Sequence, residues 1–112
     1  MHFTLKNPCA NCPFRTDKPN QQHWLGEAKA KEICQALINK QQTFQCHKTL
    51  DLPKDKHQHC AGAMIMLEHM NSPNQMMRIA ERVGMYDSTA INMSAPVFTD
   101  SEDFIEFHSE DF

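Results

Sequence analysis

The spacing of apolar residues along the chain predicts three helices. From residue 20 to residue 39 apolar side chains recur at near-helical spacing, and Gly26 divides this stretch into a short turn and a main helix. Residues 60–70 are so rich in apolar side chains that they predict a buried helix. A third helix is expected from Ser72, its N-cap, to Gly84, its stop signal. Its inner face is expected to consist of Met76, Met77, Ala80 and Val83.

The remaining segments predict short strands and loops. Residues 1–5 alternate as a short strand does, and residues 43–50 fit a strand or an extended segment. After residue 84 the helical periodicity is lost, and the chain ends in an acidic, Phe-containing segment at 97–112. We therefore expect a small single domain over residues 1–112, of the α+β class and mainly helical, with two or three helices and short strands.

Length and charge narrow the class of protein. The chain has 112 residues, of which 40% are hydrophobic, as is usual for one globular domain. Residues 1–58 carry nine Lys or Arg against five Asp or Glu, and residues 59–112 carry two against nine, so the net charge is -3. This charge does not favour nucleic-acid binding. The chain lacks an apolar run long enough for a membrane span and a signal-peptide pattern, so we expect a cytoplasmic protein.

Four of the five cysteines lie at positions where they could bind a metal ion. Cys34 lies within a predicted helix beside Ile33 and Leu37, where cysteine is usually a small buried apolar residue. The others lie in loops or at element ends. In a reducing cytosol such a set is better explained by metal binding than by disulfides. We therefore predict a metal centre on Cys9, Cys12, Cys46 and Cys60.

Two kinds of centre fit four cysteines. Structural zinc takes four thiolates in a tetrahedron, and a [4Fe-4S] cluster is also held by four cysteines. The second pair is separated by thirteen residues, which favours a cluster, whereas zinc is the commoner metal of small stable proteins. We predict zinc, with the iron–sulfur cluster as the alternative.

Three further residues are expected around the metal. His47 follows the third cysteine directly and could act as a ligand or donate a hydrogen bond to a bound sulfur. Phe14 is expected to shield the site from solvent, and Arg15 to offset the charge of a four-thiolate zinc centre. His57 and His59 lie in the polar segment KDKHQH and are expected to be solvated loop residues.

The segments PCANCPFRTDKP, FQCH and CAG, in that order, resemble a family of small phage and bacterial proteins of unknown function. Its shared pattern is Cys-x-x-Cys-Pro-aromatic-Arg, then Phe-x-Cys-His, then Cys-Ala-Gly. The resemblance covers residues 8 to 62 and leaves the second half of the chain outside it. It points to Cys9, Cys12, Pro13, Phe14, Arg15, Cys46, His47, Cys60 and Gly62. The family has no activity to transfer, so the resemblance implies a site and not a reaction.

Three functions are open at this point. The first is a non-enzymatic, metal-binding protein, phage or mobile-element encoded, that binds a host protein as an inhibitor or regulator. The second is an iron–sulfur protein that senses redox state or transfers electrons, and the third is a Cys-x-x-Cys thiol oxidoreductase. Motifs of phosphate-binding loops, zinc proteases and serine hydrolases are missing from the sequence, which disfavours an enzyme. The acidic segment 97–112 is expected to pack on its own domain or to bind a basic groove of the partner.

Overall fold

Four α-helices make up most of the regular structure. The structure is a computed structural model that describes residues 2–10, 12–18, 23–46 and 49–109. Its elements are α1 (Glu27–Cys34), the π-helical turn η2 (Gln35–Asn39), the 3-10 turn η4 (Lys54–Lys56), α2 (Ala61–His69), α3 (Gln75–Arg82) and α4 (Ser101–His108). The mainly helical class is confirmed, with one helix more than the two or three predicted. Within this part of the chain, none of the helices has the length and apolar character needed to cross a bilayer.

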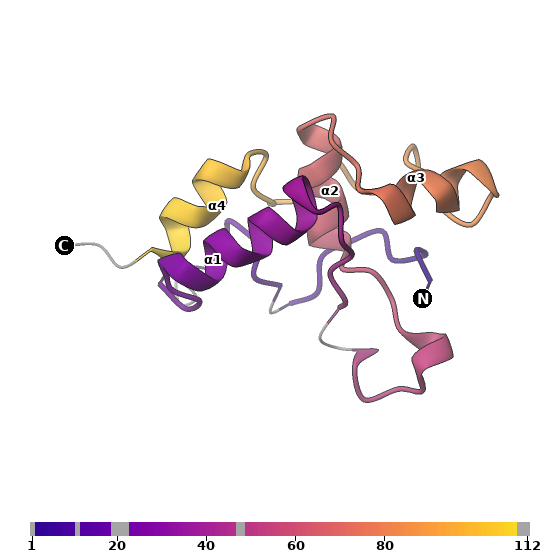
Figure 1. The fold of residues 1–112 in the computed structure, drawn as a ribbon, viewed down its shortest axis with the longest axis horizontal. Coiled ribbons are helices and arrows are strands. Elements are labelled where there is room, and N and C mark those ends of the chain that lie inside the picture. The colour runs from indigo at the N-terminus through magenta and orange to yellow at the C-terminus, as the bar shows by residue number, and fades with distance from the viewer. Residues whose placement is uncertain (1, 11, 19–22, 47–48, 110–112) are drawn as a thin grey trace.

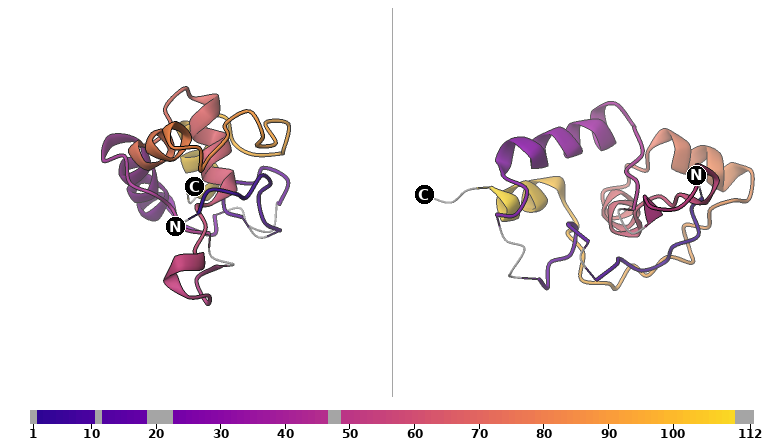
Figure 2. Two further views of the ribbon diagram at one scale, coloured as in Figure 1. Left: turned by 90° about the vertical axis from the view of Figure 1, so that its right-hand side faces the viewer. Right: turned by 90° about the horizontal axis from the view of Figure 1, so that it is seen from below.

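Helix α2 lies at the centre of the molecule because nearly all of its residues are apolar. Every residue from Ala61 to Leu67 is buried, so the helix has no solvent-facing side over this range. Figures 1 and 2 show α3 on one side of α2 and the pair α1 and α4 on the other. The prediction of a buried helix over residues 60–70 is therefore confirmed.

Helix α1 begins where the sequence predicts. Its N-cap is Gly26, whose φ of 82° lies in the left-handed region that favours glycine. The buried residues of α1 are Ala30, Ile33 and Cys34, so the thiol of Cys34 lies in the core as expected. Helix α1 packs against α4.

The N-cap of helix α3 lies two residues after the predicted N-cap. Asn74, not Ser72, is the N-cap, and its side-chain oxygen accepts a hydrogen bond from the backbone N–H of Met77 at 2.9 Å. The N–H of Ser72 is still bonded to the carbonyl of Leu67, at 2.9 Å, because the chain is completing the turn that ends α2. Gly84, at φ 83°, ends α3 as predicted.

Only half of the predicted inner face of α3 is buried. Met77 and Ala80 lie in the core, as predicted. The prediction is wrong for Met76 and Val83, whose side chains are exposed together with that of Ile79. An eight-residue helix that contacts the core on one narrow side cannot bury all of its apolar residues.

The acidic segment forms helix α4, which the sequence did not predict. The side chain of Asp100 caps its first turn by accepting a hydrogen bond from the N–H of Glu102 at 2.9 Å. The acidic residues of that turn are favourable at the positive end of the helix dipole. Phe104 is fully buried and its ring stacks on that of Phe14, with centroids 4.6 Å apart. Residues 101–108 of the segment therefore pack on their own domain, as a helix.

Strand pairing among the described residues is limited to three isolated bridges. Gln45 pairs with His59 and Arg15 with Val97, both antiparallel, and His2 pairs with Gln58 in parallel. In place of the strand predicted at residues 1–5, the described residues there form one bridge, at His2, and residues 43–46 of the segment predicted as a strand or an extended segment form one bridge, at Gln45. The bridge between Gln45 and His59 brings the segment of Cys46 to the start of α2, and the bridge between Arg15 and Val97 ties the Cys-x-x-Cys turn to the segment before α4.

Candidate metal centre

The first two cysteines lie in a tight turn. The N–H of Cys12 donates to the carbonyl of Cys9 at 3.2 Å, and the N–H of Arg15 donates to the carbonyl of Cys12 at 3.1 Å. Between them Pro13 has no N–H to satisfy, and the N–H of Phe14 is directed at the Cys12 sulfur. Backbone N–H groups aimed at sulfur stabilise a thiolate, which is the form that binds metals.

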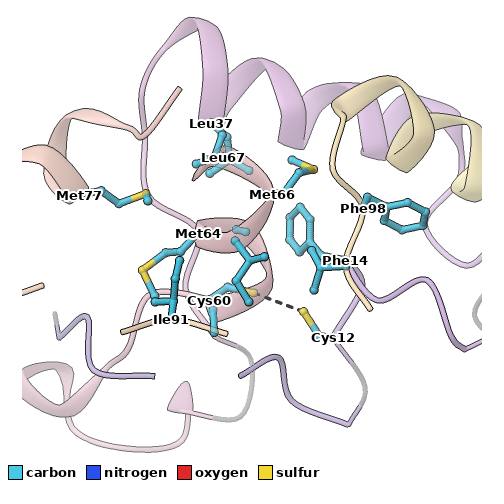
Figure 3. Packing of buried hydrophobic residues seen from close by; sticks show 14 of the residues in the cluster. Cys12, Phe14, Leu37, Cys60, Met64, Met66, Leu67, Met77, Ile91 and Phe98 are labelled. Carbon is cyan, nitrogen blue, oxygen red and sulfur yellow. Dashed lines mark hydrogen bonds between the residues drawn. The ribbon is translucent and has the colours of Figure 1, made fainter. Parts of the chain in front are cut away.

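The sulfurs of Cys12 and Cys60 are in direct contact. Their Sγ atoms lie 3.5 Å apart and share a hydrogen bond, drawn as the dashed line in Figure 3. Cys60 is the N-cap of α2, and its N–H is bonded to the carbonyl of Phe44 at 2.7 Å. Both cysteines are buried, at 0% and 4% exposure. Residues 48 positions apart in the chain therefore meet at the beginning of the central helix.

Cys9 joins this pair through Cys12. The side chain of Cys9 is hydrogen-bonded to the Cys12 thiol, so Cys12 lies between Cys9 and Cys60. The hydrogen bond with Cys60 is the main cause that raises the pKa of Cys12 well above its usual range, and burial adds to the increase. Cys12 is thus a protonated thiol at neutral pH unless a cation favours the thiolate.

Cys46 reaches the same region through the bridge between Gln45 and His59. The N–H of Cys46 donates to the carbonyl of Gln58 at 2.8 Å, which places Cys46 opposite Gln58. Since side chains alternate along extended segments, Cys46 and Cys60 lie on the same face of this pairing. Diagonal neighbours of this kind have Cα atoms about 7–8 Å apart. Cys46 is buried.

Contacts join Cys9, Cys12 and Cys60, and the bridge at Gln45 brings the segment of Cys46 towards Cys60, but these cysteines do not form a complete site. Within the described ranges, no group of three or more His, Cys, Asp or Glu side chains is arranged so that it could hold a metal ion. His47, predicted as a ligand or hydrogen-bond donor, lies outside the described residues. The four-cysteine centre therefore stays a prediction, for which the Cys12–Cys60 contact is the strongest geometric support.

Arg15 lies beside the cysteines, as predicted. Its guanidinium donates to the carbonyl of Cys9 at 3.4 Å and makes two hydrogen bonds of 2.8 Å to the carboxylate of Asp17. Asp17 is the main cause that raises the pKa of Arg15, and the charges of Cys12 and Cys9 act in the same direction. A permanent positive charge thus stands next to the Cys-x-x-Cys turn.

Phe14 and Gly62 enclose Cys12. A Cβ atom at Gly62 would lie 2.5 Å from the Cys12 sulfur and 3.0 Å from the Cβ of Phe14, so only glycine fits there. The ring of Phe14 is fully buried and makes an edge contact with Phe44, at a centroid distance of 5.4 Å. Phe14 shields the turn from the inside, as part of the core, and Figure 3 shows it close to the two sulfurs.

His59 is buried next to the site, contrary to the prediction of a solvated loop residue. Its side chain has 0% exposure, and its Nε2 accepts hydrogen bonds from the Nδ2 of Asn74 at 2.9 Å and from the N–H of Phe44 at 3.4 Å. Nδ1 therefore carries the proton and donates to the carbonyl of Cys60 at 3.1 Å. Burial lowers the pKa of His59 to about 4, so the ring is neutral and holds Cys60 in place. His57, by contrast, is only half-buried.

A second buried histidine reaches the turn from α4. Nε2 of His108 donates to the carbonyl of Pro13 at 2.8 Å, while Nδ1 accepts from the N–H of Leu25 at 3.4 Å. Burial lowers the pKa of His108 below its ordinary value. Helix α4 thereby holds the Cys-x-x-Cys turn by a hydrogen bond as well as by the ring of Phe104.

The depressed pKa of His59 predicts a loss of stability in mild acid. The unfolded chain takes up the proton at the ordinary pKa of 6.5 and the folded protein only near 4, so stability is full above pH 6.5 and falls towards pH 4. Between pH 6.5 and pH 4 the free energy of unfolding therefore falls by about 3 kcal/mol. We expect chemical denaturation to show a shallower pH dependence for His59→Gln, and an unaltered one for the control His57→Gln. An identical dependence in all three proteins would contradict the assignment.

Substitution of Gly62 tests the packing around Cys12. Although alanine is the better helix former, Gly62→Ala is expected to destabilise the protein by about 1–3 kcal/mol because the new methyl group meets the Cys12 sulfur. In a Cys12→Ala background the same substitution should cost less, and thermal unfolding of the four proteins measures this coupling. Equal costs in both backgrounds would show that the sulfur does not lie against Gly62.

Comparison with known proteins gives one match. The model of a family of unknown function, DUF6283, matches residues 4–111. Neither the curated proteins nor the solved structures contain a significant match. The family match extends far beyond residues 8–62 and corrects the expectation that the second half of the chain lies outside the family. The chain therefore belongs to the DUF6283 family of unknown function.

Proposed function

We propose that Cys9, Cys12, Cys46 and Cys60 bind one zinc ion, which ties the N-terminal loop to α2. The observation that carries the proposal is the distance of 3.5 Å between the sulfurs of Cys12 and Cys60. Two thiolates on one tetrahedral zinc, each about 2.3 Å from the ion, have sulfurs about 3.8 Å apart. The pair therefore needs to open by only a few tenths of an ångström to bind the ion.

The same distance favours a single ion over the iron–sulfur cluster. In a cubane each cysteine binds a different iron atom, so the ligand sulfurs lie much farther apart than on a single ion. Cys60 is anchored at the N-terminus of α2, and Cys12 is packed against Gly62, so neither is free to move far. We therefore keep zinc as the proposed metal.

The environment of Cys12 also disfavours a thiol oxidoreductase in which Cys12 makes the first attack on the substrate. Such enzymes depend on a cysteine whose pKa is lowered, so that the nucleophilic thiolate is present at neutral pH. The hydrogen bond with Cys60 stabilises the protonated thiol and so raises the pKa of Cys12 instead. Zinc would reverse this effect, because it binds the thiolate form.

Positive charge near the cysteines supports an anionic zinc–thiolate centre. Four thiolates around zinc are formally doubly negative, and such a centre needs nearby donors or cations. Arg15, which is paired with Asp17, supplies a guanidinium N–H donor on the side of Cys9. The N–H groups of the first turn of α2 supply the positive end of a helix dipole next to Cys60.

The proposed role of the ion is structural. A shell of four thiolates leaves no coordination position for water or a substrate. In a small domain a structural zinc site supplies several kcal/mol of folding free energy, which is a large share of the total. This reasoning favours a binding protein over an enzyme.

We further propose that this domain acts by binding another protein through the outer face of α3. Met76, Ile79 and Val83 follow one another at helical spacing and are 45%, 45% and 63% exposed. A continuous apolar row on the surface usually marks an interaction site. The helix behind it is held rigidly, since Met77 and Ala80 are buried. The regulator hypothesis therefore rests on α3 and not on the acidic segment, whose Phe104 is in the core.

Metal analysis tests the zinc proposal. Protein purified without metal affinity steps should contain about one zinc ion per chain, and Cys12→Ser should lose it together with much of its thermal stability. Cys34→Ser is the matched control, because Cys34 is buried in α1 with its sulfur 4.0 Å from the carbonyl oxygen of Ser101, and it should keep the zinc. Colourless protein without zinc, or equal loss in both variants, would refute the proposal. Brown protein with several iron atoms per chain would establish the cluster instead.

Capture experiments test the α3 surface. Wild-type protein immobilised on a support should retain a stoichiometric partner from lysate of its own cell, and Ile79→Glu should reduce the retained amount about tenfold or more, as loss of a central apolar anchor does. Leu50→Glu serves as the control, because Leu50 is equally exposed but lies in the loop before α2. Retention of the same partner by all three proteins would exclude α3 as the binding surface.

A further inference from the structure

We propose that Cys12 and Cys60 are also a redox site, at which a hydroperoxide is reduced while a Cys12–Cys60 disulfide forms. The inference rests on the proposed function in one respect, namely that zinc is released when two of its ligands are oxidised. Zinc binding and disulfide formation would then exclude one another on the same pair of sulfurs.

The contact geometry singles out this pair. The Cys12 and Cys60 sulfurs are 3.5 Å apart, and a disulfide requires them to approach to about 2.05 Å. Figure 3 shows the two side chains directed at one another, one from the N-terminal loop and one from the start of α2. The approach needed is only about 1.5 Å, and a shift of this size in the turn that carries Cys12 leaves α2 in place.

Access of the oxidant points to Cys9 as the first sulfur to react. Cys9 is only half-buried, whereas Cys12 and Cys60 are almost completely inaccessible. Cys12 is hydrogen-bonded to both of the others, so it is the sulfur through which oxidation passes from Cys9 to Cys60. The three cysteines therefore form a relay from the surface to the N-terminus of α2.

The proposed oxidation takes place in three steps, in which atoms and electrons balance. The sulfur of Cys9 attacks the peroxide, the O–O bond breaks, and a sulfenic acid forms while an alcohol, or water from hydrogen peroxide, is released. Cys12 displaces water from this sulfenic acid, which gives a Cys9–Cys12 disulfide, and Cys60 then attacks the Cys12 sulfur and releases the Cys9 thiol. In total the thiols of Cys12 and Cys60 lose two electrons and two protons, and the peroxide is reduced by two electrons.

The oxidised protein should stay folded. The disulfide joins the N-terminal loop to the start of α2, which are the segments that the proposed zinc ion also joins. The reaction thus exchanges one cross-link for another, and it releases zinc and the side chains of Cys9 and Cys46.

Peptide mapping after oxidation tests this inference. Purified protein is treated with equimolar hydrogen peroxide, digested without reduction and analysed by mass spectrometry, while a chromophoric chelator records released zinc. We expect a Cys12–Cys60 disulfide, one zinc ion released for each disulfide formed, and an unchanged far-UV circular dichroism spectrum. Cys9→Ser should form the same disulfide about tenfold more slowly or less. Cys34→Ser should behave as the wild type does.

Other products would overturn the inference. A Cys9–Cys12 disulfide as the final product, sulfinic acid on Cys9 without a disulfide, or undiminished oxidation of Cys9→Ser would each do so. Zinc content before treatment separates the two proposals. Protein that contains no zinc but forms the Cys12–Cys60 disulfide refutes the metal centre alone, and zinc-containing protein that does not form it refutes the redox site alone.

Discussion

The contact between the sulfurs of Cys12 and Cys60 is the interaction on which the rest of the structure depends. It joins the N-terminal loop to the N-terminus of the central helix, at a separation of 3.5 Å. Gly62 makes the approach feasible because any side chain at that position would overlap the Cys12 sulfur. One structural unit is thus formed by the turn that carries Cys12, the N-cap of α2 and Gly62 beside them.

Helix α4 provides the second attachment of the same turn. Phe104 stacks on Phe14, and His108 donates to the carbonyl of Pro13, so the C-terminal helix holds the residues directly after Cys12. His59 acts in a similar way on the other side, through the carbonyl of Cys60. These contacts give a physical reason for a family match that extends from residue 4 to residue 111, since the site needs support from both ends of the chain.

Features that depend on nearby residues could be predicted from the sequence. The burial of α2 follows from its apolar density, and Gly26 and Gly84 mark helix ends because both adopt positive φ. The burial of His59 could not be predicted, because its partner Asn74 lies fifteen positions away and KDKHQH is polar throughout.

Helix α4 was also not predicted from the sequence, because part of its buried face is polar. Its buried face contains His108, which a hydrophobic pattern counts as polar, although Asp100 and the acidic first turn are a helix-start signal that could have identified it. In the candidate site, the Cys-x-x-Cys turn and the neighbouring Arg15 could be predicted from the local sequence. The contact between Cys12 and Cys60 depends on tertiary structure and could not be predicted from the sequence. The spacing of the four cysteines along the chain did not distinguish one zinc ion from a cluster.

X-ray absorption at the zinc edge shows whether the four cysteines share one ion, because it reports the atoms bound to the ion and their distances. We expect a first shell of four sulfur atoms at about 2.3 Å. A shell of oxygen or nitrogen atoms without sulfur would contradict it, since zinc would then be bound elsewhere and the cysteines would not share an ion.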